Sequence, residues 1–221
     1  MHDFRYVGGR LHCEGVPVES LVKRFGSPLY VYSQSTLTDH FSKLTMALSP
    51  LDHLVCYAMK SNSNRSVLKV MSDLGSGFDI VSGGELERVV AAWGDSCKCI
   101  FSGVGKTESE IALALRKGIY AFNVESEPEL ERIDRVARGL KKKAPIAIRV
   151  NPDVDAKTHA KITTGTYENK FGIAFEKIRG AYARAAKMRN IRLRGLQMHI
   201  GSQLTKVKPF ETAVRKVVPL A

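Results

Sequence analysis

The chain has 221 residues, of which 44% are hydrophobic, and a formal net charge of +12. These values are those of a globular protein with one large or two small domains, and no apolar run approaches the roughly 20 residues that a membrane span needs. The positive charge allows a nucleic-acid partner. However, the basic residues are spread along the chain and no nucleic-acid-binding motif is visible, so we expect no nucleic-acid or membrane partner.

The cysteines and the N-terminus indicate where the protein works. The four cysteines show no Cys-x-x-Cys spacing, which disfavours a metal site and favours free thiols in a cytoplasmic protein. The first residues lack the charged-then-apolar layout of a signal peptide. We therefore expect a cytoplasmic protein without a structural metal.

A small hairpin is predicted at the start of the chain. Residues 4–7 and 11–13 flank Gly8 and Gly9, and Gly-Gly tolerates the positive φ angles of a tight turn. A hairpin has no place in the architecture expected for the rest of the chain. Residues 1–27 are therefore predicted to be a hairpin and helix that pack against a β-rich domain absent from this chain.

From residue 29 onward, short apolar, β-rich runs recur between amphipathic segments. The runs are residues 29–32, 54–59, 77–81, 99–102, 120–124, 146–150 and 193–200. A strand–helix repeat is typical of parallel α/β units, and so many units in succession predict a (β/α)₈ TIM-type barrel over residues 28–221 rather than a doubly wound sheet. A barrel needs eight strands, so we expect a piece of a longer protein that stops after the seventh.

Three predicted helices begin with the same chemistry. Ser82, Thr107 and Ser126 are each followed three residues later by a glutamate. This spacing is typical of the capping box, in which two free backbone N–H groups are satisfied reciprocally. Each predicted box follows a strand within a few residues, as parallel strand–helix units require.

Polar residues at the predicted strand ends carry the candidate chemistry. Lys60 ends the run 54–59, His199 lies near the end of 193–200, and Asp79 and Arg149 interrupt two other runs. Individually, they also fit a surface lysine, a core histidine and structural ion pairs. Because barrel active sites lie where strands end, their convergence on one rim indicates a site. A lysine at this rim is expected to be partly desolvated, so that its amine can attack a carbonyl.

Two further features lie near this rim. Gly201 allows close backbone approach and Ser202 offers a hydroxyl and an N–H, which together suit a phosphate oxygen. The long stretch 151–173 fits a lid over the catalytic face or, alternatively, a disordered insertion.

Several stretches resemble one enzyme family. YAMKSN at residues 57–62 is similar to the cofactor-lysine motif of pyridoxal-phosphate-dependent decarboxylases with an alanine-racemase-type barrel, and GFDIVSGGEL at 77–86 resembles the strand and cap that follow it. RVNPD at 149–153, the pairs Thr158-His159 and Thr164-Gly165, NKFGI at 169–173 and HIGSQ at 199–203 resemble the diaminopimelate decarboxylase branch.

The resemblance implies a role for each candidate residue. Lys60 would bind pyridoxal 5'-phosphate as a Schiff base, His199 would stack on the pyridine ring, and Gly201 and Ser202 would contact the phosphate. Asp79 and Arg149 would line the pocket and orient Lys60 and the ring. The reaction implied is the decarboxylation of a small amino acid, meso-2,6-diaminopimelate, to L-lysine and CO₂ by a homodimer of the full-length protein.

Other interpretations remain open. The family's glycine run for the phosphate and the glutamate that pairs with the pyridine nitrogen do not occur in this sequence, so we expect little or no activity from this chain alone. The alternatives are a pyridoxal-phosphate-binding homeostasis protein, which is a single barrel, and a catalytically inactive decarboxylase relative.

Overall fold

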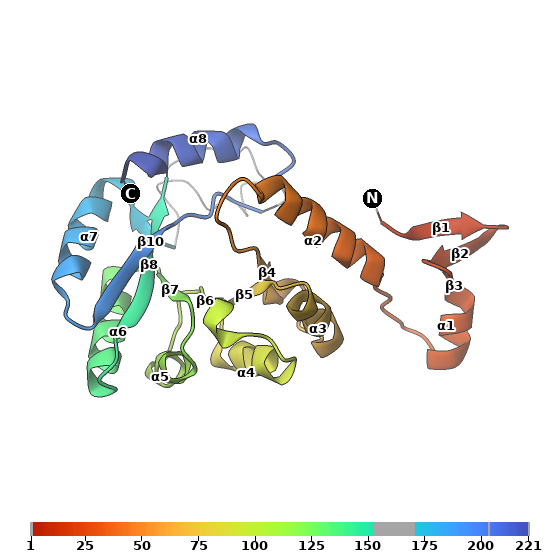
Figure 1. Cartoon of the computed structure of the whole chain (residues 1–221), viewed down its shortest axis with the longest axis horizontal. Helices are drawn as coiled ribbons and strands as arrows, with labels where there is room; N and C mark the ends of the chain where they lie inside the picture. The colour runs from red at the N-terminus through yellow and green to blue at the C-terminus, as the bar shows by residue number, and fades with distance from the viewer. Residues whose placement is uncertain (1, 153–170, 203, 221) are drawn as a thin grey trace.

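A computed structural model of the chain describes residues 2–152, 171–202 and 204–220 (Figure 1). The strands are β1 (Phe4–Val7), β2 (Arg10–Cys13), β3 (Val16–Pro17), β4 (Cys56–Ala58), β5 (Gly77–Ile80), β6 (Cys99–Phe101), β7 (Ala121–Val124), β8 (Ala144–Asn151), β9 (Ile173–Ala174) and β10 (Ile191–Gln197). The α-helices are α1 (Val18–Phe25), α2 (Gln34–Leu48), α3 (Arg65–Asp73), α4 (Gly83–Ala91), α5 (Glu108–Lys117), α6 (Glu127–Gly139), α7 (Ile178–Lys187) and α8 (Lys208–Val217). Short 3-10 helices are η1 (Met59–Ser61), η2 (Ser96–Lys98), η3 (Phe175–Lys177) and η4 (Val218–Leu220).

The N-terminal residues form an antiparallel hairpin. Phe4 pairs with Cys13 and Val7 with Arg10, and β3 adds a short third strand beside β2. The turn residues Gly8 and Gly9 have φ angles of 55° and 79°, which is the left-handed region that glycine adopts at no steric cost. The association of this segment with a further domain stays a prediction.

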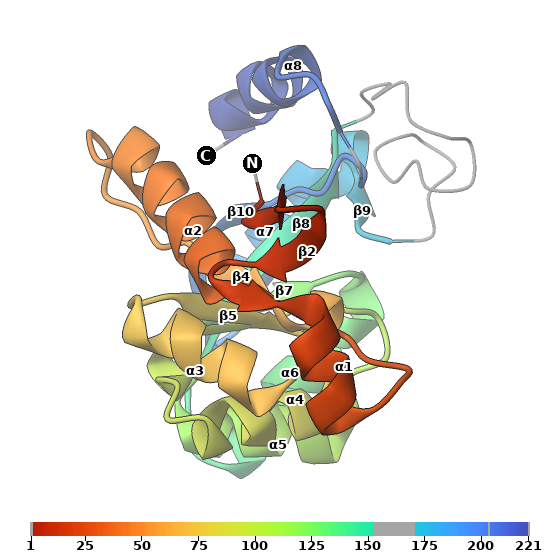
Figure 2. The same cartoon turned by 90° about the vertical axis from the view of Figure 1, so that its right-hand side faces the viewer.

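The main sheet is parallel, with the strand order β10-β8-β7-β6-β5-β4 and with β9 paired to β8 beyond the end of β10. Figure 1 shows the strands as a curved row, with α3, α4, α5 and α6 along one side of it and α8 on the opposite side. Figure 2, a quarter turn away, shows α3, α4, α5 and α6 grouped below the strands and α8 above them. The α/β class and the barrel-type succession of parallel strands predicted from the sequence are confirmed.

The prediction that residues 29–32 form the first strand is wrong. These residues are extended but belong to neither sheet. Their side chains nevertheless alternate as in a strand, since Tyr30 and Tyr32 are exposed while Leu29 and Val31 are partly buried. The partly buried residues line a groove with Leu21 and Phe25 of α1 instead of pairing with β4. The parallel row therefore begins at β4. Among the described residues the row has six strands, and β9 pairs with β8 off the row, whereas seven successive strands were predicted.

The core lies between the sheet and the helices that follow each strand. Every residue of β7 is buried, as expected for a parallel strand covered on both faces. Phe78, Phe101 and Phe122 on three adjacent strands are fully buried, and the last two rings stack with centroids 5.9 Å apart. This core fixes the strands whose carboxyl ends carry the candidate site.

Of the three predicted capping boxes, only that of α5 is complete. Thr107 Oγ1 accepts the N–H of Glu110, whose carboxylate accepts the N–H of Thr107. At α4 and α6 the serine hydroxyl caps the helix as predicted, but the glutamate reaches one residue further back, to Val81 N–H or Glu125 N–H. The capping boxes of α4 and α6 are incomplete for the same reason: the glutamate carboxylate accepts the backbone N–H of the residue that follows the preceding strand.

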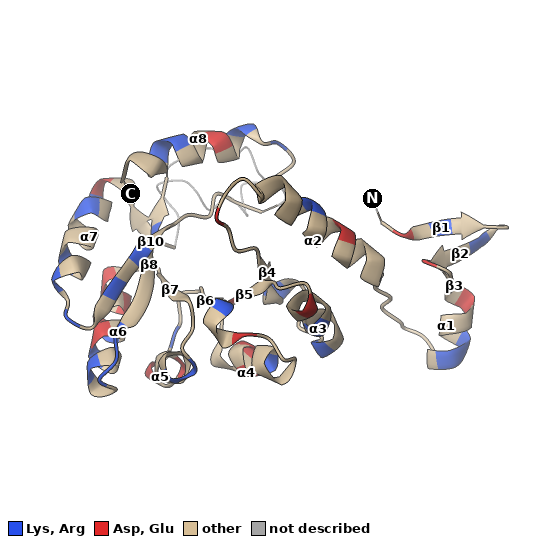
Figure 3. Ribbon diagram, in the orientation of Figure 1, with Lys and Arg blue, Asp and Glu red and all other residues tan. Residues whose placement is uncertain are grey.

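The charged residues of the described part of the chain are spread over many elements of the fold (Figure 3). Figure 3 shows lysines and arginines on elements along the whole chain, interspersed with acidic residues. Within the described ranges, no helix is long and apolar enough to span a membrane.

Candidate functional site

A cavity of about 360 Å³ opens at the carboxyl ends of the parallel strands. This size is within the range of small-molecule sites. Because parallel strands end at the same edge of a sheet, residues far apart in the sequence meet there. The lining residues are Lys60, Asp79, Val81, Ser102, Gly103, Val104, Glu125, Arg149, Phe171, Gln197, His199 and Ser202.

Lys60 enters the cavity from η1, the single turn that follows β4. The turn is held by Ser61, whose hydroxyl donates to Ala58 O at 2.7 Å and lies 2.9 Å from the oxygen of the Tyr57 hydroxyl. Asn64 then caps α3 through its side chain. Lys60 itself is exposed, so the expected partial desolvation of its amine is not found in the chain as described. Its aliphatic stem is free to bring the amine to any ligand in the cavity.

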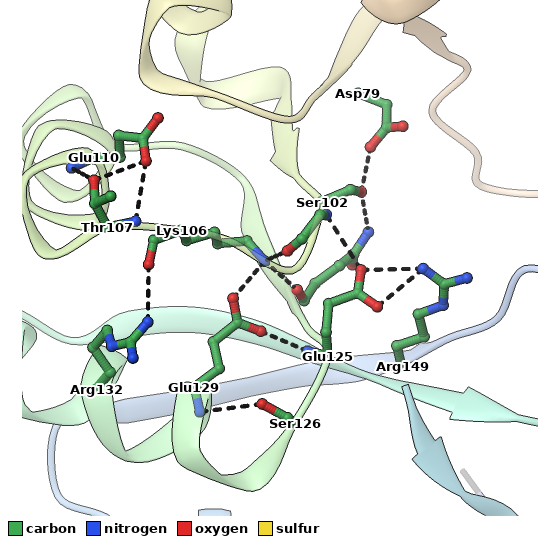
Figure 4. Close-up of polar contacts among 12 residues, drawn as sticks. Asp79, Ser102, Lys106, Thr107, Glu110, Glu125, Ser126, Glu129, Arg132 and Arg149 are labelled. Atoms are coloured by element: carbon green, nitrogen blue, oxygen red, sulfur yellow. Dashed lines mark hydrogen bonds and ion pairs between the residues drawn. The ribbon is translucent and has the colours of Figure 1, made fainter. Parts of the chain in front are cut away.

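Asp79 lies beside Lys60 on β5, the neighbouring strand. Its Oδ1 accepts a hydrogen bond from Ser102 Oγ, which in turn accepts one from Asn123 Nδ2 at 2.9 Å (Figure 4). Burial raises the pKa of Asp79 above its ordinary range, whereas the Ser102 hydrogen bond and the charge of Lys60 lower it. The net direction is upward, so Asp79 holds a proton more readily than a solvated aspartate.

Arg149, on β8, is a buried cation with only part of its hydrogen-bonding capacity used. Nη1 donates to both carboxylate oxygens of Glu125, at 3.1 and 2.9 Å (Figure 4). Nε and Nη2 are buried and have no acceptor among the described residues. Because a buried donor without an acceptor costs about 1–3 kcal/mol, the cavity is suited to a ligand that brings acceptor oxygens.

His199 lies two residues beyond the end of β10, and Gly201 and Ser202 follow it. Burial lowers the pKa of His199, and the nearby charges of Arg149 and Lys60 lower it further. The ring is therefore neutral over more of the physiological pH range than a solvated histidine, which suits packing against an aromatic or heterocyclic ligand. Gly201 has a φ angle of 138°, in the region that favours glycine.

The structure brings five of the six predicted site residues to one cavity. Lys60, Asp79, Arg149, His199 and Ser202 line it, and Gly201 adjoins it without being a lining residue. The predicted lid residues 153–170, the motif residues within them and Gln203 lie outside the described residues. The roles given to the site residues stay predictions.

Sequence reasoning missed several lining residues, of which Ser102 and Glu125 matter most. Both lie at or directly after a predicted strand end, so the rule that found Asp79 and Arg149 would also have found them. Behind the cavity, the loop residue Lys106 and Glu129 of α6 form a buried ion pair at 2.8 Å. The sequence carries no signal for the burial of a lysine in such a loop.

Comparison with known proteins shows one family. The pyridoxal-binding domain of the pyridoxal-dependent decarboxylases matches residues 34–221. The chain is 54% identical over 210 residues to the diaminopimelate decarboxylase of Neisseria meningitidis serogroup B, covering 95% of this chain and 51% of the relative. It is 50% identical to that of Pseudomonas aeruginosa over 220 residues, covering 100% of this chain and 53% of the relative.

Solved structures give the same result. The diaminopimelate decarboxylase of Helicobacter pylori, complexed with L-lysine, superimposes with a TM-score of 0.89 at 39% identity and covers 92% of this chain and 52% of that chain. The diaminopimelate decarboxylase of M. jannaschii, in co-complex with L-lysine, superimposes with a TM-score of 0.92 at 35% identity. The match covers 100% of this chain and 53% of that chain. The chain thus spans about half the length of the relatives that it matches.

Proposed function

The chain belongs to the pyridoxal-dependent decarboxylases, and on that premise we propose that it supplies the pyridoxal 5'-phosphate site of a diaminopimelate decarboxylase. The substrate of the whole protein is then meso-2,6-diaminopimelate, and the products are L-lysine and CO₂. A homodimer and a cytoplasmic location belong to the same proposal. The identities of 50–54% to diaminopimelate decarboxylases favour this substrate over other amino acids.

The observation that carries the proposal is the chemistry gathered around one cavity. A flexible lysine, a buried arginine with unused donors, a histidine with a lowered pKa and a serine beside a glycine with positive φ all meet there. Pyridoxal phosphate, when bound, supplies an aldehyde carbon for amines and a ring that accepts the electrons released by loss of CO₂. The donors and the cavity size fit such an anionic, aromatic molecule.

The family resemblance gives each residue a proposed task, and the surroundings of each residue support it. The Lys60 amine would hold the cofactor through its aldehyde group, since Lys60 lines the cavity. His199, being neutral over a wide pH range, packs against one face of the ring. Ser202 and the Gly201 backbone bind the phosphate. Asp79 and Arg149 hold the polar edge of the ring and the Lys60 amine in place.

A chimeric enzyme tests the proposal. Residues 1–221 would replace the matching half of the Neisseria meningitidis enzyme, to which they are 54% identical, and L-lysine formation from meso-diaminopimelate would be measured. We expect lysine formation, and its loss in the same chimera with Lys60→Ala. A folded chimera that retains pyridoxal phosphate but forms no lysine would contradict the proposal and would favour a cofactor-binding protein without this activity.

A further inference from the structure

Lys106 is buried although it lies in the loop between β6 and α5, with 1% of the residue exposed. An ammonium group removed from water is costly unless it is paired and hydrogen-bonded. All three N–H donors of Nζ are used. They donate to Gly103 O at 2.5 Å, to Asn123 O at 2.8 Å and to Glu129 Oε1 at 2.8 Å.

These contacts join β6 and β7 where their own ladder stops. The register between the two strands runs from Ile100 and Ala121 to Phe101 and Phe122. Beyond that point, Lys106 connects the carbonyl of Gly103 to that of Asn123. The carboxyl ends of both strands, which face the cavity, are therefore held by a side chain behind them.

One branch of hydrogen bonds leads from this pair to Arg149. Glu129 Oε2 accepts the N–H of Glu125 at 2.6 Å, and Glu125 Oε1 accepts the N–H of Gly103 at 3.2 Å (Figure 4). The same Glu125 carboxylate pairs with Arg149. Hydrogen bonds with Glu129 and Gly103 thus hold both the backbone and the side chain of Glu125, the residue that pairs with Arg149.

A second branch leads to Asp79. Asn123, whose carbonyl accepts from Lys106, donates through Nδ2 to Ser102 Oγ, and Ser102 donates to Asp79 (Figure 4). Neither Lys106 nor Glu129 lines the cavity, yet two opposite charges that do line it are connected to them.

We propose that Lys106 and Glu129 are a positioning pair that sets the placement of Arg149 and Asp79 at the cofactor cavity. The inference rests on the proposed cofactor site and assigns the pair no contact with the cofactor. A positioning role can be distinguished from a stabilising role. Replacement of a buried ion pair by apolar side chains often leaves the stability of the fold unchanged or higher. A purely stabilising pair could be replaced in this way without consequence for the site.

The test compares three variants of the protein. Lys106→Met leaves the Glu129 charge unpaired, and Lys106→Met/Glu129→Met removes both charges and the hydrogen bonds of both side chains. Ile133→Ala makes a cavity at a fully buried position of α6, one turn along the helix from Glu129, and keeps both charges and their hydrogen bonds. For each, the free energy of unfolding, the Kd for pyridoxal phosphate and the visible circular dichroism per bound cofactor would be measured. The last quantity reports how the cofactor is oriented and is insensitive to stability alone.

We expect both Lys106 variants to raise the Kd by about tenfold, the lower end of the effect known when groups that orient metal-binding side chains are removed, and to reduce the circular dichroism. Ile133→Ala should lower stability and leave both cofactor readouts unchanged. If Lys106→Met does not fold, the double variant carries the test, since no unpaired charge remains. Should the double variant also fail to fold, Glu129→Gln, which keeps an oxygen for Lys106 but disturbs the bond to Glu125 N–H, should still show a raised Kd.

The outcomes separate the inference from the proposed function. Unchanged Kd and circular dichroism in a folded double variant, or in Glu129→Gln if that variant is needed, would overturn the positioning role alone. Failure of the unaltered protein to bind pyridoxal phosphate would overturn the proposed function and the inference with it.

Discussion

Both carboxylate oxygens of Glu125 accept hydrogen bonds from one nitrogen of Arg149, at 3.1 and 2.9 Å. The two side chains are nearly buried, with 2% and 10% exposed. Removing one member of such a pair leaves the other charge unpaired and costs about 3–5 kcal/mol. We therefore expect Glu125→Leu to lower the free energy of unfolding by about this amount and to weaken pyridoxal phosphate binding, as measured by denaturant and cofactor titrations.

The exposed pair of Glu108 and Arg135 provides a matched control, since more than half of each side chain is accessible to water. Exposed pairs contribute little because water already solvates both charges. Glu108→Leu should therefore leave the cofactor affinity unchanged and stability little affected. Equal effects of Glu125→Leu and Glu108→Leu would show that the Glu125 pair is not a buried constraint.

Asp79 should make the fold less stable as the pH rises. Its pKa is raised above the ordinary value of 3.8, chiefly by burial. A carboxyl group with a raised folded-state pKa contributes stability below its unfolded pKa, and this contribution is lost as the pH rises through the folded pKa. Asp79→Asn removes the titration, so the stability of the variant relative to the unaltered chain should increase over that interval. Denaturant unfolding at a series of pH values measures the difference, and a difference independent of pH would contradict the assignment.

Gly77 at the start of β5 has no room for a side chain. A methyl group there would lie 2.5 Å from Lys98 O and 2.6 Å from Cys56 Sγ. The carbonyl belongs to the backbone that leads into β6 and cannot rotate away, so Gly77→Ala should lower the free energy of unfolding by about 1–3 kcal/mol.

Gly180 in α7 is the matched control for Gly77. No atom lies within 4 Å of its added methyl group, and alanine is favoured over glycine inside a helix. Gly180→Ala should therefore raise the free energy of unfolding by about 0.5–1 kcal/mol. Denaturant unfolding should show a lower free energy of unfolding for Gly77→Ala and a higher one for Gly180→Ala. Changes in the same direction would contradict the packing described for β5.

The cysteines should differ in reactivity in the native protein. Cys97 is exposed, whereas burial raises the pKa of Cys56 to about 11 and that of Cys99 to about 12. Since the thiolate is the reactive form, iodoacetamide should modify Cys97 first, which peptide mass analysis can follow in time. In denaturant the three should react alike. Native-state modification of Cys99 as fast as Cys97 would be inconsistent with the burial of β6.

The strands of the sheet could be predicted where a short apolar, β-rich run of sequence is enough to identify them. The runs 77–81, 99–102, 120–124 and 146–150 overlap β5, β6, β7 and β8, because each is an apolar, β-rich stretch between amphipathic helices. The run 29–32 has the same local pattern but no partner strand. β-Propensity describes how a residue fits a pleated, half-buried surface, and it does not reveal whether a neighbouring strand is available.

The site was predictable to a similar extent. Asp79 and Arg149 stand out because charged residues interrupt apolar runs, and Lys60 because it follows one. Glu125 directly follows the run 120–124 and was not among the predicted site residues, although its side chain lines the cavity. Lys106 could not be found, since its burial depends on acceptors from β6, β7 and α6 that only the folded chain brings together.

Reductive attachment of pyridoxal phosphate, followed by peptide mass analysis, tests the central claim most directly. The protein would be incubated with limiting pyridoxal phosphate, reduced with borohydride and digested, with Lys60→Ala treated in parallel. We predict that the label is found on the peptide containing Lys60 and that it is lost from the variant. A label distributed over the exposed lysines in both proteins, or concentrated on a lysine outside the cavity, would contradict the assignment of this site.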